Sequence, residues 1–165
     1  MDLDQVVRDL APRLLRYAIG RTGSRGLGED VAQQALTALV QRWRRVGPPE
    51  SPEAFAFAIA RRRAGRAVVR QRLLVPLQAL AGRAAVAPDP EAQAASSENG
   101  RVVRTALTRL ARLDRESLLL VAAAGLRSAD AARLLGISES AVRMRTLRAR
   151  RRLLSLLENR NGSRG

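Results

Sequence analysis

The chain has 165 residues, of which 46% are apolar and 27% are charged, so it can form one or two small domains with hydrophobic cores. All 30 basic residues are arginine, and with only 15 acidic residues the formal net charge is +15 at pH 7. The absence of cysteine and histidine excludes disulfides, zinc fingers and histidine-based catalysis, and four aromatic residues are too few for a base-stacking platform. The arginine excess favours a phosphate-bearing polyanion as partner.

The sequence gives no sign of targeting to a membrane. No apolar run reaches transmembrane length, and the acidic start MDLDQ is unlike a signal peptide. We therefore expect a cytoplasmic protein with no membrane insertion. The composition also leads us to expect no metal and no cofactor.

Charge divides the chain into unequal parts. Residues 1–75 carry a net charge of +7, residues 76–100 carry −2, and residues 101–165 carry +10. The middle stretch holds three prolines and lacks sustained helical periodicity, which predicts a flexible linker. We expect domains at 1–75 and 101–158 and a disordered tail from residue 159 to residue 165; a single helical domain with a long loop is the alternative.

Apolar residues in the first domain recur at spacings of three and four, which predicts helices and not strands. The first helix is predicted to end near Gly20–Gly23 and the second at Gly47–Pro49. Ser51 is predicted to cap a third helix that begins at Pro52 and runs to about Arg72. This domain is therefore predicted to be a three-helix bundle.

Arginines gather on one face of the third helix. Residues 61–72 contain six arginines and no acid, and Arg62, Arg66 and Arg70 recur at i, i+4 and i+8 opposite an apolar arc. Like charges at this spacing repel each other, so a phosphate backbone would stabilise the face. A solvated helix face is the alternative, but such faces usually mix both signs of charge. We interpret this face as a nucleic-acid contact.

The second domain has the pattern of a helix-turn-helix. Asp114 is predicted to cap a helix over Ser117–Ala124, Ser128 to cap a short helix that stops at Gly136, and Ser138 to cap a long final helix. Small and apolar residues at fixed offsets around the turn glycine support the motif. The predicted fold class is all-α: an N-terminal helical bundle and a C-terminal four-helix helix-turn-helix domain, joined by a flexible linker.

The final helix has the composition of a recognition helix. Residues 143–152 contain six arginines and no acid. The first half of such a helix reads base edges in the major groove, and the flanking basic residues hold phosphates. Two large apolar residues opposite the core arc could contact thymine methyl groups or a partner. The predicted DNA-reading residues are Ser140, Arg143, Met144, Arg145, Leu147, Arg148 and Arg151.

Five stretches of the sequence carry a resemblance to a known family. They are LAPRLLRYAIGRTG at 10–23, EDVAQQAL at 29–36, SPEAFAFAIARRRAGR at 51–66, ALTRLARLDRESLLL at 106–120 and AARLLGISESAVRMRTLRARRRL at 131–153. Together they resemble the sigma-70 family of bacterial RNA polymerase sigma factors, and the size resembles its extracytoplasmic-function (ECF) group, which has only regions 2 and 4. The resemblance implies a transcription initiation factor that is not an enzyme.

The resemblance also implies roles and partners. Region 4 would read the −35 promoter element, region 2 would recognise and melt the −10 element, and an anti-sigma factor would be a regulatory partner. The −10 contacts would be Ser51, Phe55, Arg61, Arg62, Arg66 and Arg70. Contacts with the β′ clamp helices and β flap of core RNA polymerase would be Asp30, Val31, Gln33, Gln34, Leu36, Leu118 and Leu119.

Two other functions are considered. A stand-alone helix-turn-helix regulator with a dimerisation or sensor bundle would bind specific duplex DNA without polymerase. A hydrolase or phosphotransferase using Glu29 and Asp30 is disfavoured, because adjacent residues on a helix point about 100° apart and cannot readily ligate one metal.

Overall fold

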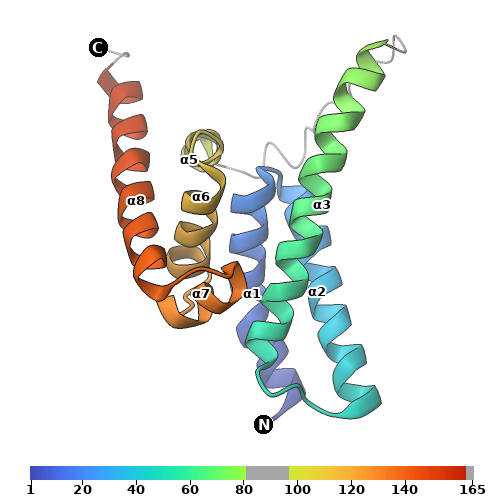
Figure 1. Ribbon diagram of the computed structural model, residues 1–165. Coiled ribbons are helices and arrows are strands. Elements are labelled where there is room, and N and C mark those ends of the chain that lie inside the picture. The colour runs from blue at the N-terminus through green and yellow to red at the C-terminus, as the bar shows by residue number, and fades with distance from the viewer. Residues whose placement is uncertain (81–96, 163–165) are drawn as a thin grey trace.

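The computed structural model describes residues 1–80 and 97–162, and all regular structure in these ranges is helical (Figure 1). The predicted all-α class is confirmed for the described residues. Three helices that pack side by side form the N-terminal half, as predicted: α1 (Leu3–Thr22), α2 (Arg25–Val46) and α3 (Pro52–Leu80).

Local sequence signals explain where these helices begin and end. Gly23 ends α1 with φ 73°, the left-handed conformation that glycine adopts without strain. Ser24 caps α2 by accepting a hydrogen bond from the backbone N–H of Leu27. Ser51 caps α3 as predicted, with 3.1 Å between its Oγ and the backbone nitrogen of Ala54.

The third helix is longer than predicted. It continues to Leu80 instead of ending near Arg72, and it contains Pro76. The residues around this proline are strong helix formers without glycine, so one lost backbone donor does not end the helix. In Figure 1, α3 extends beyond the ends of α1 and α2. Most of the predicted linker, residues 81–96, lies outside the described residues.

The C-terminal half contains the helix-turn-helix, formed by the last two helices. Gly136 ends α7 in the left-handed conformation with φ 66°, and Ser138 caps the final helix with 3.1 Å between its Oγ and the backbone nitrogen of Ala141, both as predicted. The elements are α5 (Glu98–Thr108), α6 (Arg112–Leu118), the π-helical segment η1 (Leu119–Ala123), α7 (Ser128–Leu135) and α8 (Glu139–Gly162).

Three predicted boundaries in this half are wrong. Asp114 lies inside α6 and not before it, because the chain is already helical from Arg112. Ser128 is the first residue of α7 and its side chain makes no capping hydrogen bond. Residues 159–162, predicted to be disordered, continue α8.

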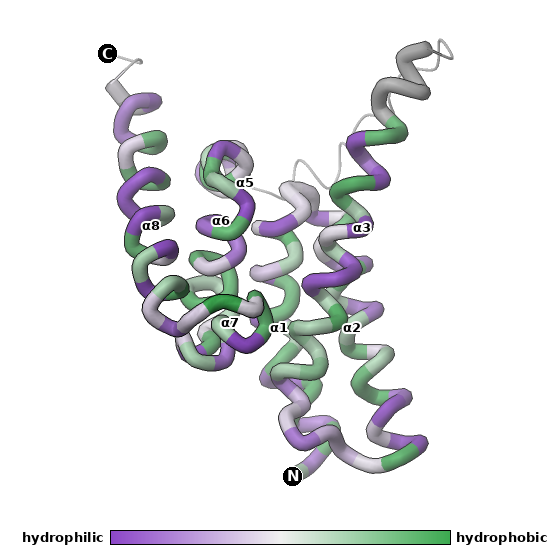
Figure 2. The backbone as a smooth tube through the Cα atoms, in the orientation of Figure 1, coloured by the Kyte–Doolittle hydropathy of each residue, from purple (hydrophilic) through white to green (hydrophobic). Residues whose placement is uncertain are grey.

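The two halves share one hydrophobic core. Tyr17 and Phe57 are fully buried in the N-terminal half and meet edge to face, with ring centroids 5.8 Å apart. Leu120 and Val142 are fully buried in the C-terminal half, and the same cluster of buried residues joins them. Figure 2 shows hydrophilic and hydrophobic residues alternating along α3 and α8, as expected for helices with one buried face.

A glycine permits the close approach of α1 and α2. A Cβ atom built on Gly28 would lie 2.8 Å from the backbone nitrogen of Ile19 and 2.9 Å from its Cα. Backbone atoms cannot move aside as a side-chain end can, so only glycine fits at this crossing. Gly26, two residues earlier on the same helix, has open space at its Cβ position.

We therefore expect Gly28→Ala to lower the free energy of unfolding by about 1–3 kcal/mol, because α1 and α2 must separate to admit the methyl group. Gly26→Ala is the matched control, and no loss of stability is expected there since alanine favours the helix. Urea unfolding followed by circular dichroism measures both. Equal stability of the two variants would contradict the close packing.

Candidate nucleic-acid interface

Helix α8 presents its predicted recognition face to solvent. Its inner face is buried through Val142, Thr146 and Ala149. On the outer face, Met144 is 61% exposed and Leu147 is 43% exposed, although both are large and apolar. Six of the seven predicted DNA-reading residues are exposed: Ser140, Arg143, Met144, Leu147, Arg148 and Arg151.

The seventh predicted residue, Arg145, is held inside the domain. Its Nη1 donates to Asp114 Oδ1 at 2.8 Å, and the Asp114 carboxylate is nearly buried on α6. Arg148 Nε lies 3.8 Å from the other oxygen of the same carboxylate while its side chain stays largely exposed. Arg145 therefore ties α8 to α6, and its role in reading DNA stays a prediction. Asp114, which was predicted to cap a helix, is the acceptor of this hydrogen bond between α8 and α6.

Acidic residues of the helix-turn-helix are paired with nearby arginines. Glu139 accepts a hydrogen bond from Arg143 one helical turn later. At the start of α7, the hydrogen bond from Arg127 holds the pKa of the Asp130 carboxyl below its usual value, and a second hydrogen bond from Arg133 adds to this effect. Further along α8, three exposed arginines make no hydrogen bond or ion pair with the described residues: Arg150, Arg151 and Arg152.

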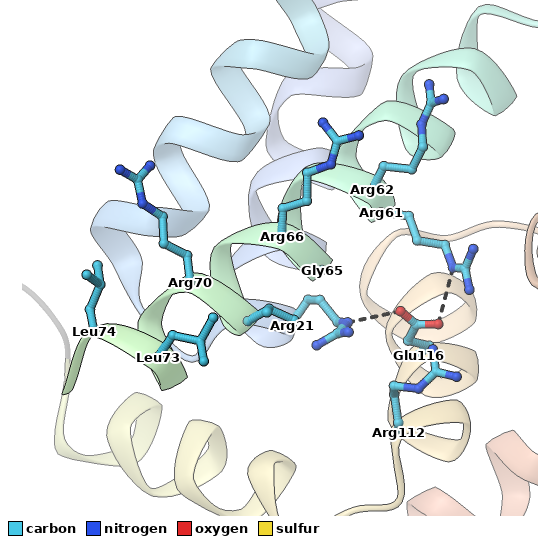
Figure 3. A pocket seen from close by; sticks show the side chains of 11 residues that line it. Arg21, Arg61, Arg62, Gly65, Arg66, Arg70, Leu73, Leu74, Arg112 and Glu116 are labelled. Atoms are coloured by element: carbon cyan, nitrogen blue, oxygen red, sulfur yellow. Dashed lines mark hydrogen bonds and ion pairs between the residues drawn. The ribbon is translucent and has the colours of Figure 1, made fainter. Parts of the chain in front are cut away.

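A second basic surface lies on α3. Arg62, Arg66 and Arg70, here called the α3 arginine face, are exposed and line an open pocket of about 630 Å³ between α3 and α6. Figure 3 shows these three side chains extending from α3 away from Glu116, whereas Arg61 points toward it. No hydrogen bond or ion pair within the described part of the chain engages the α3 arginine face.

The other two predicted −10 residues, Ser51 and Phe55, lie at the opposite end of α3. Phe55 is half-buried and lines a separate pocket of about 680 Å³ together with three arginines of α2. A helix rises 1.5 Å per residue, so Phe55 lies roughly 16 Å along the helix from Arg66. The arginines of this second pocket, Arg42, Arg44 and Arg45, were missed because they stand at the end of a helix that the sequence marked only by its apolar stripe.

A buried ion cluster joins the two halves of the chain. Glu116 on α6 is 2% exposed, and it accepts hydrogen bonds from Arg21 Nε at 2.9 Å and from Arg61 Nε at 3.2 Å. Burial raises the pKa of the nearby Tyr17 phenol, and the Glu116 carboxylate raises it further. Burial lowers the pKa of Arg115, and the positive charge of Arg21 adds to that effect. Figure 3 shows Arg21 and Arg61 converging on Glu116 from α1 and α3.

Apolar and backbone contacts surround this cluster. Leu119 packs directly on Gly20 of α1, where a Cβ atom would lie 2.4 Å from Leu119 Cδ2. The backbone carbonyls of Ala124 and Ala123 accept hydrogen bonds from the Nε atoms of Arg13 at 2.6 Å and Arg16 at 3.0 Å.

Three residues of the predicted polymerase-binding set are buried in this structure. Leu118 is 6% exposed, Leu119 is 4% exposed, and Val31 is 3% exposed within the core of the N-terminal half. Val31 therefore packs in the domain and offers no surface to a partner. The two leucines are covered because the second domain packs on α1, which the periodicity of a single helix could not reveal.

The remaining predicted polymerase-binding residues lie on α2. Asp30, Gln33 and Gln34 are exposed and Leu36 is partly buried. Gln33 and Leu36 line an open groove of about 580 Å³ between α1 and α2. Groove residues missed from the sequence include Leu15, Val40 and Gln41. Val40 belongs to the apolar stripe of the second predicted helix, and such a stripe does not show which of its members stay open to a groove.

The described residues lack two other kinds of feature, a metal-binding cluster and a membrane-spanning helix. Histidine, cysteine and acidic side chains form no group of three or more that could hold a metal ion. None of the helices in the same part of the chain has the length and apolar character needed to cross a membrane.

Comparison with known proteins identifies the two halves. Residues 6–73 match the family model described as Sigma-70 region 2, and residues 100–153 match the model described as Sigma-70, region 4. The chain is 33% identical over 167 residues to the ECF RNA polymerase sigma factor ShbA of Streptomyces griseus, covering 95% of this chain and 86% of that protein. The chain belongs to the sigma-70 family of RNA polymerase sigma factors, in its ECF group.

Other relatives agree with this assignment. The chain is 33% identical to the protein named Probable RNA polymerase sigma factor RfaY of Xanthomonas campestris, over 81% of this chain and 34% of that protein. The sigma factor RpoE of Bartonella quintana, solved with the anti-sigma factor NepR, has 25% identity and a TM-score of 0.68 over 94% of this chain and 96% of that chain. A PhyRSL–NepR complex from Sphingomonas has the same fold, with a TM-score of 0.56, 23% identity and coverage of 94% of this chain and 88% of that chain.

The family membership settles the main function. This ECF factor acts in transcription initiation, and the resemblance inferred from the sequence is confirmed. The stand-alone regulator is not favoured, because the N-terminal half is sigma region 2 and not a dimerisation or sensor bundle.

The tie between α6 and α8 can be tested by stability. We expect Asp114→Ala to lower the free energy of unfolding by about 1.5–3 kcal/mol, because it removes the charged acceptor of a partly buried hydrogen bond from Arg145. Glu139→Gln is the control: it weakens the exposed Glu139–Arg143 pair within α8 and should lower the free energy of unfolding by about 0.5 kcal/mol or less. Urea unfolding of both variants provides the measurement, and a cost for Asp114→Ala as small as that of the control would contradict the anchor role.

Proposed function

We propose that α8 of this ECF factor reads the −35 promoter element and that α3 binds the −10 element as it melts. The observation that carries this proposal is the pair of acid-free arginine runs, residues 61–72 and 143–152, one on each sigma region. Each run includes exposed arginines that have no acidic partner among the described residues: Arg62, Arg66 and Arg70 on α3, and Arg150, Arg151 and Arg152 on α8. Arg61, Arg143, Arg145 and Arg148 of the same runs lie near carboxylates of this chain. Two such surfaces on separate regions suit two DNA elements whose spacing is set by the polymerase.

On α8, the exposed side chains divide by chemistry. Arg143 and Arg148 carry planar donor forks that can bind the O6 and N7 acceptors of guanine in the major groove. Met144 and Leu147 offer apolar surface to thymine methyl groups, which explains their exposure. Arg151 lies further along the helix, where a recognition helix leaves the groove, and it would hold a phosphate.

On α3, the arginine face would hold the phosphates of the displaced strand. Single-stranded DNA binds through charge along its backbone and through stacking of its bases on aromatic rings. Arg62, Arg66 and Arg70 supply the charge, and Phe55 supplies a ring in a pocket with three arginines of α2. Arg61 would join the strand only when it is released from Glu116.

The partners follow from the same surfaces. The groove between α1 and α2, with Gln33 and Leu36 in its lining, would dock on the β′ clamp helices of core RNA polymerase. Leu118 and Leu119 would contact the β flap after the two regions separate. An anti-sigma factor is a further proposed partner, supported by the similarity to a sigma factor solved with one. Acting with polymerase on promoter DNA, the factor would be cytoplasmic and would perform no catalysis itself.

Run-off transcription tests the proposed function. Purified core polymerase is assayed on a promoter library with and without the protein, and we expect a set of start sites that depend on it. The protein alone should not select those promoters as duplexes. If no start site depends on the protein, and the protein alone shifts specific duplexes, the proposal is wrong.

The recognition helix makes a sharper prediction. Arg143→Ala and Arg148→Ala should each weaken holoenzyme binding at the −35 element by about 1–3 kcal/mol, because each removes a guanidinium group that would donate two hydrogen bonds to one base edge. Arg8→Ala, at the exposed start of α1 in region 2 and thus outside the helix proposed to read the −35 element, is the control and should have no effect there. Binding is measured on promoters with single substitutions at each −35 position. Unchanged base preference in both variants would contradict the assignment of α8.

A further inference from the structure

We propose that the pocket between α3 and α6, here called the α3–α6 pocket, binds a small amphipathic anion that carries a phosphate head group on a short hydrocarbon chain. The volume of the pocket, about 630 Å³, is within the usual range for small-molecule sites in proteins. Among the described residues that line it, six are arginines and one is a glutamate. The inference concerns a ligand other than promoter DNA or polymerase, and it does not depend on the roles proposed above.

One side of α3 gives the pocket a charged end and an apolar end. Four residues that line the pocket follow one another at spacings of four and so lie along one side of the helix: Arg61, Gly65, Val69 and Leu73. Because a helix rises 1.5 Å per residue, this row is roughly 18 Å long. Figure 3 shows Arg61 and Glu116 at one end of the pocket and Leu73 at the other. A ligand with a charged end and an apolar end therefore fits its length.

The charged end has fewer carboxylates than guanidinium groups. Arg21 and Arg61 share the single carboxylate of Glu116, at 2.9 Å and 3.2 Å. The Arg21 side chain is 6% exposed, and its Nη1 atom makes no hydrogen bond with the described residues. Burial lowers the pKa of Arg115, and the positive charge of Arg21 lowers it further. The positive charge here is not fully neutralised by this chain.

A phosphate head group suits this end of the pocket. Arg112 lines it from α6, is exposed, and makes no hydrogen bond or ion pair with the described residues. Guanidinium groups bind phosphate oxygens through charge-assisted hydrogen bonds, often two at a time. Arg112 therefore supplies donors to a ligand without giving up a contact within the protein.

The apolar end exposes large aliphatic side chains. Val69 is 56% exposed, Leu73 is 64% exposed and Leu74 is 42% exposed, and all three line the pocket. A hydrocarbon chain that lay on them would remove apolar surface from water, which is favourable. No aromatic residue belongs to the described lining, so a nucleobase would find no ring on which to stack. The lining therefore favours a hydrocarbon chain over a nucleotide.

Gly65 lies between the two ends of the row. No heavy atom lies within 4 Å of the position that a Cβ atom would take there, so the packing of α3 does not require glycine. Glycine inside a helix is less favourable than alanine. A ligand that reaches from Arg61 to Leu73 would pass over this residue, and a methyl group added here would narrow its path.

Isothermal titration calorimetry of the full chain with monomeric octyl phosphate tests the proposal. Inorganic phosphate represents the head group alone, and octyl glucoside carries the same chain without the charge. We expect one octyl phosphate per chain, bound at least about tenfold more tightly than inorganic phosphate, since burying two methylene groups already accounts for that factor. Octyl glucoside should show no measurable binding.

Gly65→Ala tests the shape of the pocket. Its methyl group should weaken octyl phosphate binding about tenfold, because it occupies space that the ligand needs. Stability towards urea should not fall, because alanine favours a helix. Gly26→Ala is the matched control, since its Cβ position is equally open and Gly26 lies on α2 outside the pocket lining. Unchanged affinity in Gly65→Ala would overturn the proposal.

Arg112→Gln tests the charged end at an exposed residue. Arg109→Gln is its matched control, because it removes the same charge from an exposed residue that does not line the pocket. We expect octyl phosphate to bind about tenfold more weakly to Arg112→Gln and with nearly unchanged affinity to Arg109→Gln. An equal loss in both variants would indicate general attraction to a basic protein and would contradict a defined site.

Three other results would also overturn the proposal. Equal affinities for inorganic phosphate and octyl phosphate would mean that the apolar end takes no part. Tighter binding of GDP than of octyl phosphate would assign the pocket to a nucleotide. Binding that begins only above the micelle concentration of octyl phosphate would indicate recognition of an anionic surface, such as a membrane, and not of a single molecule. None of these measurements uses transcription, so they are separate from the test of the proposed function.

Discussion

The buried carboxylate of Glu116 determines how the two regions meet. A charged group that is 2% exposed must be paired, and here its partners are Arg21 and Arg61 from two helices of the other region. Removing one member of such a buried pair typically costs about 3–5 kcal/mol, yet forming the pair gains little over leaving both groups in water. The interface is therefore specific in its arrangement without being strong.

The scarcity of acidic residues decides which arginines are available. The chain has 30 arginines and 15 acidic residues, so there are too few carboxylates to give each arginine its own acidic partner. Asp114, Asp130 and Glu139 engage arginines of the helix-turn-helix, and Glu116 engages those between the regions. Residues 61–72 of α3 and residues 143–152 of α8 hold no acid at all. Positive charge is thus concentrated at two surfaces by the placement of the acids as much as by that of the arginines.

The sequence predicted the helices well and their surroundings poorly. Ser138 and Gly136 mark helix ends through local backbone chemistry, so the helix-turn-helix could be placed from a short window of residues. Pro76 was predicted to lie beyond the end of the third helix, but the helix continues through it because the neighbouring residues favour helix and only one backbone donor is lost. Leu119 was predicted to face polymerase and Asp114 to cap a helix, and both instead contact distant elements of this chain. Helical periodicity shows that a face is apolar or charged, but it does not show which distant element packs on that face. Contacts between distant parts of the chain, such as the one between Arg61 and Glu116, could not be predicted from the sequence and are seen only in the structure.

The arrangement of exposed and covered surfaces favours one order of assembly. In the structure, the outer face of α8 and the α3 arginine face are exposed, Arg61 is paired with Glu116, and the two leucines proposed to contact polymerase are buried. A factor with this arrangement can meet duplex DNA through α8 alone, but that contact engages only one of its two DNA surfaces. Polymerase binding would uncover the leucines and release Arg61 in one step, since the same interface holds both. Of the four arginines proposed for the −10 surface, Arg62, Arg66 and Arg70 are already exposed, and Arg61 would join them when it is released from Glu116.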